Sequence, residues 1–214
     1  MPELQIIGGP ASNFVWVTRI ASMEKNVPYT LVPVMPHTPE VDAIHPFGKI
    51  PVMRHGDVTL AESRAICAYI DRVFDGPPLT ARDPVVATQI EQWISIICTT
   101  IDPLWVRQYV AAFVFPGTAD DSPDRTRIDA ALPKMAPQFA VMDRAVAKTG
   151  HLVGNGFTLA DAYFTPILFY MSKLPESRSL LAQSPALEAY LGRHIERPSV
   201  KATMSPGIPA ARRR

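Results

Sequence analysis

The sequence predicts a small α/β domain followed by an all-helical domain, within a chain of 214 residues. Two observations support this expectation. Strand-like runs rich in β-branched and aromatic residues occur only up to Leu60, and beyond it apolar residues recur with helical spacing. The Asp75-Gly76-Pro77-Pro78 stretch between the two parts is typical of a linker. We therefore expect domains at 1–76 and 85–205, a linker at 77–84 and a flexible tail at 206–214.

The first part has the predicted order of a βαβ unit, a β-hairpin and a helix. The breakers Gly8-Gly9-Pro10 end the first strand, and Ser12 and Asn13 both suit the N-cap of the helix that follows. A second helix is expected to begin at Glu62-Ser63. The strands are expected at residues 4–8, 29–34, 52–54 and 58–60, with a loop of at most one helical turn at 35–44.

The second part contains four predicted helices, at 84–115, 124–148, 159–173 and 186–195. Pro133 and Pro137 fall inside the second of them. Because an interior proline costs a helix about 3 kcal/mol, we expect a bend or a break there. Thr158, with Asp161 three residues later, predicts a capping box at the start of the third helix.

Composition excludes several classes of function. Hydrophobic residues make up 47% of the chain and charged residues 19%, and the formal net charge is +1. A nearly neutral chain gives no electrostatic reason to expect nucleic acid or an anionic membrane as a partner. No apolar run approaches the ~18 residues of a membrane helix, and the start lacks the features of a signal peptide. We expect a cytoplasmic protein.

The metal-binding residue types show no ligand spacing along the sequence. Cys67 and Cys98 form no CxxC motif and fit apolar helical patterns. The five histidines, at positions 37, 45, 55, 151 and 194, are likewise scattered. The sequence therefore predicts no metal site.

Two motifs carry a resemblance to a known family. HPFGKIPVM followed by LAESRAICAYI, and HLVGNGFTLADAYF about ninety residues later, together resemble the glutathione S-transferase family of the cytosolic, serine type. The resemblance extends along most of the chain. It implies a thioredoxin-like βαβαββα-type domain followed by an all-helical domain, glutathione as co-substrate, a homodimer and a role in detoxification.

The resemblance also implies which residues bind glutathione. Pro51 would be a cis-proline that turns the backbone groups of Val52 toward the cysteinyl unit. Glu62 would meet the α-ammonium, while Ser63 and its helix N-terminus would hold the α-carboxylate. A simple N-cap is the alternative for Ser63.

Three further residues would complete the glutathione site by resemblance. Lys49 and His37 would reach the glycine carboxylate from loops. Solvated loop residues are the alternative for both, and we favour it for His37. Asp102 would reach the γ-glutamyl ammonium across a dimer interface, and its alternative is a solvated or Pro103-associated kink residue.

Ser12 occupies the position of the catalytic hydroxyl in this family. The thiol of a free cysteine has a pKa near ~8.5, so conjugation needs a group that stabilises the thiolate. A hydrogen bond from Ser12, together with the helix N-terminus, would do so. Asn13 is a possible substitute donor. The first tyrosine is Tyr29 and no cysteine occurs near this position, which argues against the tyrosine and cysteine types.

The electrophile is expected to be small and hydrophobic and to bind between the two domains. The candidate pocket residues are Ala11, Phe14, Trp105, Tyr109, Phe113, Phe115 and Tyr163. The last five lie in predicted helices, where such aromatic residues are more often part of the core. The sequence leaves other functions open. These are peroxide reduction, dehalogenation, isomerisation, and binding of glutathione or hydrophobic ligands with little catalysis.

Overall fold

The computed structural model of the chain describes residues 2–205, 207 and 208. It divides into two compact units. The first comprises residues 2–80 together with 198–205, and the second comprises residues 81–197 with 207 and 208. The predicted domain 85–205 thus differs at its end, because residues 198–205 group with the first unit. Most of the predicted tail, 206 and 209–214, lies outside the described residues.

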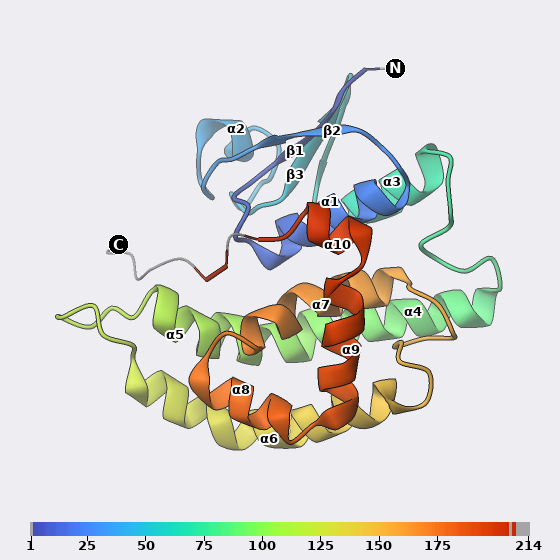
Figure 1. Ribbon diagram of the computed structural model, residues 1–214. Coiled ribbons are helices and arrows are strands. Elements are labelled where there is room, and N and C mark those ends of the chain that lie inside the picture. Colours follow the sequence, from blue (N-terminus) through green and yellow to red (C-terminus); the bar gives the residue numbers. More distant parts are fainter. Residues whose placement is uncertain (1, 206, 209–214) are drawn as a thin grey trace. The chain divides into compact units, whose positions relative to one another are not determined.

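The first unit contains a four-stranded sheet in the order β2-β1-β3-β4 (Figure 1). β1 pairs parallel with β2 and antiparallel with β3, and β3 pairs antiparallel with β4. This is the order expected for a βαβ unit followed by a hairpin. The strands are β1 (Leu4–Ile7), β2 (Tyr29–Val32), β3 (Val52–His55) and β4 (Val58–Ala61).

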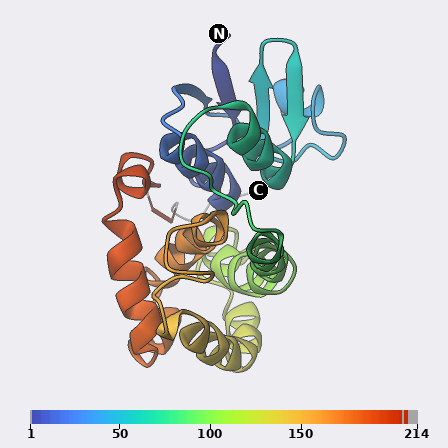
Figure 2. The same ribbon diagram turned by 90° about the vertical axis from the view of Figure 1, so that its right-hand side faces the viewer.

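Both faces of this sheet are covered. Successive side chains of a strand point to opposite faces, so apolar residues on each face need an element to pack against. On one face Leu4 and Met53 pack with Ile66 and Ile70 of helix α3 (Ser63–Val73). On the opposite face Ile7 and Val52 pack against the short helix α2 (Pro39–Asp42). Helix α1 (Asn13–Glu24) lies beside α3 (Figure 2). The strands at the centre of the sheet are therefore fixed from both sides.

A last helix returns to the first unit from the far end of the chain. Helix α10 (Pro198–Ala202) contacts α1, and the indole Nε1 of Trp16 donates to Thr203 Oγ1 at 2.9 Å. Both Trp16 and Thr203 are fully buried. No sequence pattern predicts this helix, because it has only five residues, begins with Pro198 and has partners that are distant along the chain.

In the second unit, all secondary structure of the described residues is helical. A continuous helical run from Pro84 to Val114 contains two wide-turn π-helical segments, and Pro103 opens the second of them. The elements are α4 (Pro84–Ile96), η1 (Ile97–Ile101), η2 (Pro103–Val110), α5 (Ala111–Val114), α6 (Arg125–Ala147), α7 (Leu159–Met171), α8 (Pro175–Ala182) and α9 (Pro185–Ile195). Every residue of α7 is buried, and α4, η2, α8 and α9 pack around it.

Of the bend or break predicted at Pro133 and Pro137, the break is wrong, since α6 continues through both prolines. The two prolines lie one turn apart on the exposed side of the helix. Carbonyls that lose their partners on that side can be solvated by water. The opposite side carries the buried residues Met135, Phe139 and Met142, whose packing holds the helix on both sides of the prolines.

Helix α8 lies between the predicted helices 159–173 and 186–195, where the sequence predicts no helix. Pro175 is its first residue, where a missing N–H costs nothing. Within the described residues no helix has both the length and the apolar character needed to cross a membrane.

Candidate functional site

The sheet register gathers three separate segments at one end of β3. Val52 pairs antiparallel with Ile7 on one side and with Ala61 on the other. In an antiparallel pair the residues before Val52 lie opposite those after its partners. Pro51 therefore lies between the segments that begin at Gly8 and at Glu62. The Ile50-Pro51 peptide bond at this position is cis.

The turn from β1 into α1 passes very close to this end of the sheet. Gly8 has a φ of +150°, and a Cβ there would lie 2.6 Å from Val15 Cγ2 and 3.0 Å from Ile50 Cβ. Only glycine fits such a backbone without displacing a neighbour. The turn therefore holds the N-terminus of α1 close to the Ile50-Pro51 bond.

Ser12 is the N-cap of α1, one of the two residues predicted for that position. Its Oγ accepts a hydrogen bond from the Val15 N–H at 3.4 Å, and its own N–H donates to Gly9 O at 3.0 Å. The Ser12 side chain is half-buried, whereas Asn13 is only 3% exposed. The acceptor role of Oγ leaves the hydroxyl proton available to donate. Of the two candidates, Ser12 is the more accessible donor.

Glu62 has an unusual backbone for a residue with a side chain. Its φ is 71° and its ψ is 121°, and it is the N-cap of the eleven-residue helix α3. Ser63, predicted as the other half of this pair, is the first residue of the helix and is 7% exposed. The simple N-cap alternative for Ser63 is therefore wrong, because Glu62 holds that position. The N-terminal end of α3, with its backbone N–H groups and its positive partial charge, can bind an anion.

His45 joins this group, although it was not among the predicted site residues. Its Nε2 lies 3.2 Å from Glu62 Oε1. The contact links the loop before β3 to the start of α3 across seventeen positions of sequence. The HPFG motif that begins with His45 was the available signal, but nothing in the motif indicated which residue the imidazole would contact.

The two predicted loop residues, His37 and Lys49, lie close together. The His37 N–H donates to Gly48 O at 2.9 Å, and a Cβ on Gly48 would lie 2.1 Å from His37 Nδ1. His37 Nδ1 is also 3.8 Å from Asp42 Oδ1, and the His37 side chain is 73% exposed. Lys49 is exposed as well. The loop thus presents two basic side chains to solvent.

Asp102 lies in the second unit, within the long helical run. Its carboxylate is 5% exposed and accepts a hydrogen bond from Arg107 Nε at 2.9 Å. The alternative interpretation of Asp102 as a solvated residue is therefore wrong. The predicted kink at Pro103 corresponds to the π-helical segment that begins there.

Three of the predicted pocket residues are core residues in the structure. Trp105, Tyr109 and Tyr163 have no accessible surface. Trp105 stacks on Phe139 at a centroid distance of 4.2 Å and donates to Gln138 Oε1 at 2.7 Å. The prediction that these three side chains line an open pocket is wrong, because apolar helical faces pack against neighbouring helices first.

Tyr109 has a structural network of its own. Its hydroxyl donates to Glu176 Oε2 and accepts from the Ser177 N–H, both at 3.0 Å. Burial raises the pKa of Tyr109 to about 12, and the neighbouring Glu176 contributes to the rise. Tyr109 thus stays protonated and connects η2 to α8. The remaining pocket candidates, Ala11, Phe14, Phe113 and Phe115, keep some exposed surface.

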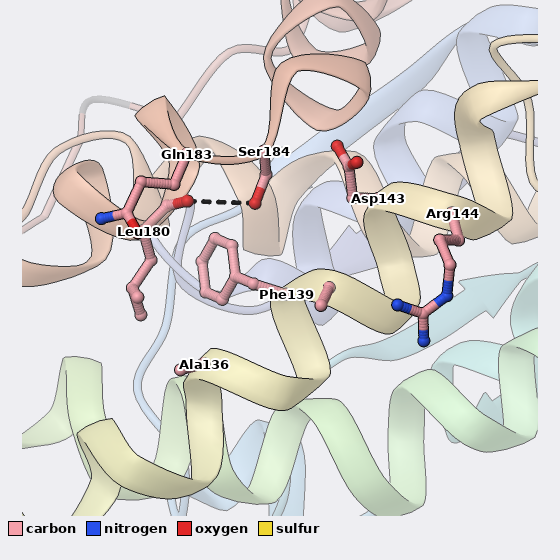
Figure 3. A pocket seen from close by; sticks show the side chains of 8 residues that line it. Ala136, Phe139, Asp143, Arg144, Leu180, Gln183 and Ser184 are labelled. Atoms are coloured by element: carbon pink, nitrogen blue, oxygen red, sulfur yellow. Dashed lines mark hydrogen bonds between the residues drawn. The ribbon is translucent and has the colours of Figure 1, made fainter.

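A hollow of about 250 Å³ lies between α6 and the end of α8 (Figure 3). Its polar groups are used structurally. Ser184 Oγ donates to Leu180 O at 3.0 Å, and Asp143 Oδ1 accepts from the Leu187 N–H at 3.0 Å. None of the predicted site residues lines it. The lining residues are Ala136, Phe139, Ala140, Asp143, Arg144, Leu180, Gln183 and Ser184.

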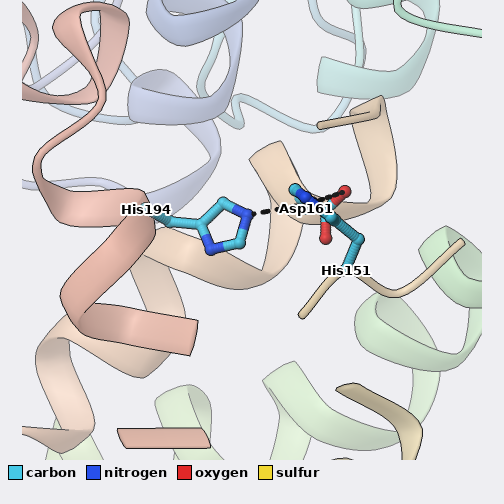
Figure 4. Close-up of side chains that lie close together, drawn as sticks. All are labelled: His151, Asp161 and His194. Atoms are coloured by element: carbon cyan, nitrogen blue, oxygen red, sulfur yellow. Dashed lines mark hydrogen bonds and ion pairs between the residues drawn. The ribbon is translucent and has the colours of Figure 1, made fainter. Parts of the chain in front are cut away.

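The structure brings together three potential metal ligands that are scattered in the sequence (Figure 4). Ligand atoms of His151, Asp161 and His194 lie within 4.8 Å of one another. Asp161 nevertheless accepts four hydrogen bonds, two on each oxygen, from Leu152, Thr158 and Tyr190. Both lone pairs of each oxygen are therefore used.

Hydrogen bonding also explains how the two histidine rings are oriented. His194 Nδ1 lies 2.8 Å from Tyr190 O, which accepts, so the neutral ring presents the lone pair of Nε2. His151 Nδ1 faces that lone pair at 3.3 Å and can donate to it. Burial is the main cause of a lowered pKa at both histidines. The two histidines are thus neutral, hydrogen-bonded neighbours of the predicted capping box at Thr158 and Asp161.

Comparison with known proteins agrees with this fold. The model of the glutathione S-transferase N-terminal domain matches residues 6–78, and the model of the C-terminal domain matches residues 106–198. The chain belongs to the glutathione S-transferase family. The match confirms the family that the sequence motifs indicated and, with it, the thioredoxin-like fold of the first unit and the helical fold of the second.

Individual relatives of the family span the whole chain. Glutathione S-transferase F13 of Arabidopsis thaliana is 27% identical over 216 residues, which cover 97% of each chain. The crystal structure of glutathione transferase F7 from Populus trichocarpa has 28% identity and a TM-score of 0.84, covering 94% of this chain and 97% of its own. A theta class enzyme from Xanthomonas axonopodis pv. citri, solved with glutathione bound, has 25% identity and a TM-score of 0.82, covering 98% and 100%.

Proposed function

We propose that this glutathione transferase conjugates the glutathione thiolate to a small hydrophobic electrophile and that Ser12 activates the thiol. The observation that carries the proposal is the position of the Ser12 hydroxyl. It caps α1 at the end of the sheet where Pro51 and Glu62 also meet. A hydroxyl beside a helix N-terminus is a suitable environment for an anion.

The chemistry requires an ionised sulfur. The Ser12 hydroxyl would donate a hydrogen bond to the thiolate, and the positive end of the α1 dipole would stabilise the same charge, so both lower the thiol pKa. The thiolate would then attack an electrophilic carbon and form a C–S bond. Either the bond to the leaving group breaks and its electron pair departs with that group, or a π bond breaks and its electron pair moves to a neighbouring atom of the electrophile, which takes up a proton. Asn13 remains a substitute donor in this proposal, but its burial favours Ser12.

The rest of glutathione would be bound by the residues gathered around Pro51. The Glu62 carboxylate would pair with the α-ammonium, and Ser63 with the first turn of α3 would hold the α-carboxylate. The backbone of Val52 would pair with the cysteinyl unit. At the other end, the exposed side chains of Lys49 and His37 would bind the glycine carboxylate.

A homodimer, with Asp102 contributing to the partner's γ-glutamyl site, is part of the proposal. Phe47 supports it, because this large aromatic side chain is 71% exposed in the single chain. Exposed aromatic side chains are typical anchors of protein interfaces. We also propose a cytoplasmic location and a role in detoxification, without a bound metal. Ala11, Phe14, Phe113 and Phe115 remain the proposed walls of the electrophile site.

Steady-state kinetics with a panel of aromatic halides, epoxides, enones and organic peroxides tests the proposal. Ser12→Ala should lower kcat by about 10²-fold, the order expected for removal of one donor to a developing anion, while glutathione binding persists. Asn13→Ala, the matched change at the neighbouring residue, should affect kcat much less. Equal turnover of wild type and Ser12→Ala would contradict the catalytic role of Ser12. Glutathione binding without turnover of any compound would favour a binding protein.

A further inference from the structure

His45 is a buried histidine held in one orientation by the backbone around it. The residue is 3% exposed, and its own N–H donates to Val41 O at 2.8 Å. The N–H of Phe47 donates to His45 Nδ1 at 3.0 Å. This bond closes a local turn of the type that asparagine and aspartate side chains form with the backbone two residues later.

The Phe47 hydrogen bond fixes the tautomer of His45. A backbone N–H can only donate, so Nδ1 must be the acceptor. The hydrogen of the neutral ring is consequently on Nε2. Nε2 lies 3.2 Å from Glu62 Oε1, which can only accept when ionised. His45 therefore presents a directed N–H donor to one oxygen of the Glu62 carboxylate.

Glu62 is a residue whose orientation needs such support. Its backbone has a φ of 71°, a conformation that costs a residue with a side chain about 1–3 kcal/mol. Its side chain is 69% exposed, so solvent alone would let the carboxylate rotate among rotamers. The bond from His45 holds one oxygen and leaves the exposed side of the carboxylate open to a cation.

We infer that His45 is a positioning residue, which holds the Glu62 carboxylate in place for the α-ammonium group of glutathione. The inference rests on the proposed function. It concerns binding of the γ-glutamyl end only, because His45 acts through Glu62 and not on the sulfur. Loss of His45 should therefore weaken glutathione binding and leave kcat at saturating glutathione nearly unchanged.

Two substitutions separate the turn from the contact with Glu62. In His45→Asn the amide oxygen can still accept from the Phe47 N–H, but the side chain is too short to reach Glu62. In His45→Gln the amide nitrogen can reach further toward Glu62, whereas the local turn is lost. His55→Asn is the matched control, since His55 is a buried histidine of the same unit that contacts Tyr69 and not the site.

Calorimetric titration of the full-length variants with glutathione tests the inference, with thermal melting as the check of folding. His45→Asn should raise the Kd about three- to tenfold, less than full loss of a charged hydrogen bond because the carboxylate is exposed. His45→Gln should bind more tightly than His45→Asn, and His55→Asn should bind like the wild type. Glu62→Gln should weaken binding on its own, and adding His45→Asn to it should change the Kd by less than about twofold.

The contrary outcomes are distinct. Full additivity of His45→Asn and Glu62→Gln, or weaker binding by a folded His45→Gln than by His45→Asn, would mean that His45 does not act through Glu62. A fall in kcat equal to the rise in Kd would also overturn the inference. A wild-type chain that binds no glutathione would refute the proposed function itself, and this inference with it.

Discussion

Removing the Asp161 carboxylate should destabilise the second unit more than almost any other single polar change. Asp161 is fully buried at the start of α7. It accepts from Leu152 N–H at 3.0 Å, Thr158 N–H at 2.9 Å, Thr158 Oγ1 at 3.1 Å and Tyr190 Oη at 3.0 Å. The carboxylate thus joins a loop, a helix start and α9 at one point.

The magnitude follows from these four bonds. A hydrogen bond to a charged group contributes about 1.5–3 kcal/mol, but bonds that share one acceptor are not additive. Breaking a buried charged network typically costs about 3–5 kcal/mol, because the remaining groups stay buried without a partner. We expect Asp161→Ala to lower the free energy of unfolding by that amount. Thr158→Ala removes only the side chain of the cap and should cost about 1 kcal/mol.

Urea unfolding measures these differences. All variants are compared at the same protein concentration, so that any contribution of association to stability is equal. Asp129→Ala is the matched control, since this aspartate is 63% exposed and pairs with Arg125 on the surface of α6. It should change the free energy of unfolding by less than about 0.5 kcal/mol. A loss below about 1 kcal/mol for Asp161→Ala would refute the view that the capping network holds α7 in place.

Two further predictions concern buried charges. The Lys25 side chain is 3% exposed, and its Nζ donates to the backbone carbonyls of Asp71 and Gly76. Lys25→Met should lower the free energy of unfolding, measured in urea, by about 2–3 kcal/mol, and an unchanged value would contradict a stabilising role. Because the pKa values of His151 and His194 are lowered in the folded state, chiefly by burial, the unfolded state binds more protons once the pH falls below about 6.5. The free energy of unfolding should therefore be constant near pH 8 and decrease from about pH 7 toward pH 5.5. The double variant His151→Gln, His194→Gln should lose less stability over this range, and identical pH profiles for the variant and the wild type would contradict this cause.

Much of the fold could be predicted from local sequence. Gly8-Gly9-Pro10 and the linker at Gly76-Pro77 mark the ends of strands and helices, because few residues suit those backbones. The predicted strand centres and the start of α1 accordingly agree with the structure. Proline was the less reliable signal. It neither ended α6 at Pro133 nor excluded a helix at Pro175, since its effect depends on the exposed face and on the position within the helix.

The remaining features depend on contacts between distant parts of the chain. Trp16 and Thr203 are 187 positions apart, so no local pattern could assign α10 to the first unit. Apolar aromatic residues have the same helical spacing in a core and in a pocket, so the sequence leaves both positions open for Trp105, which the structure places in the core. The contact of His45 with Glu62 likewise requires the strand pairing that brings the two segments together.

The most direct test of the central claim is the pKa of the glutathione thiol when it is bound to the protein. Ultraviolet absorbance of the thiolate, followed through a pH titration of the complex at saturating glutathione, gives this pKa. We predict a value at least about one unit below the ~8.5 of a free cysteine thiol in the wild type, and a return toward ~8.5 in Ser12→Ala. An unshifted pKa in the wild type, or an equally lowered pKa in Ser12→Ala, would contradict the proposal that Ser12 activates the thiol.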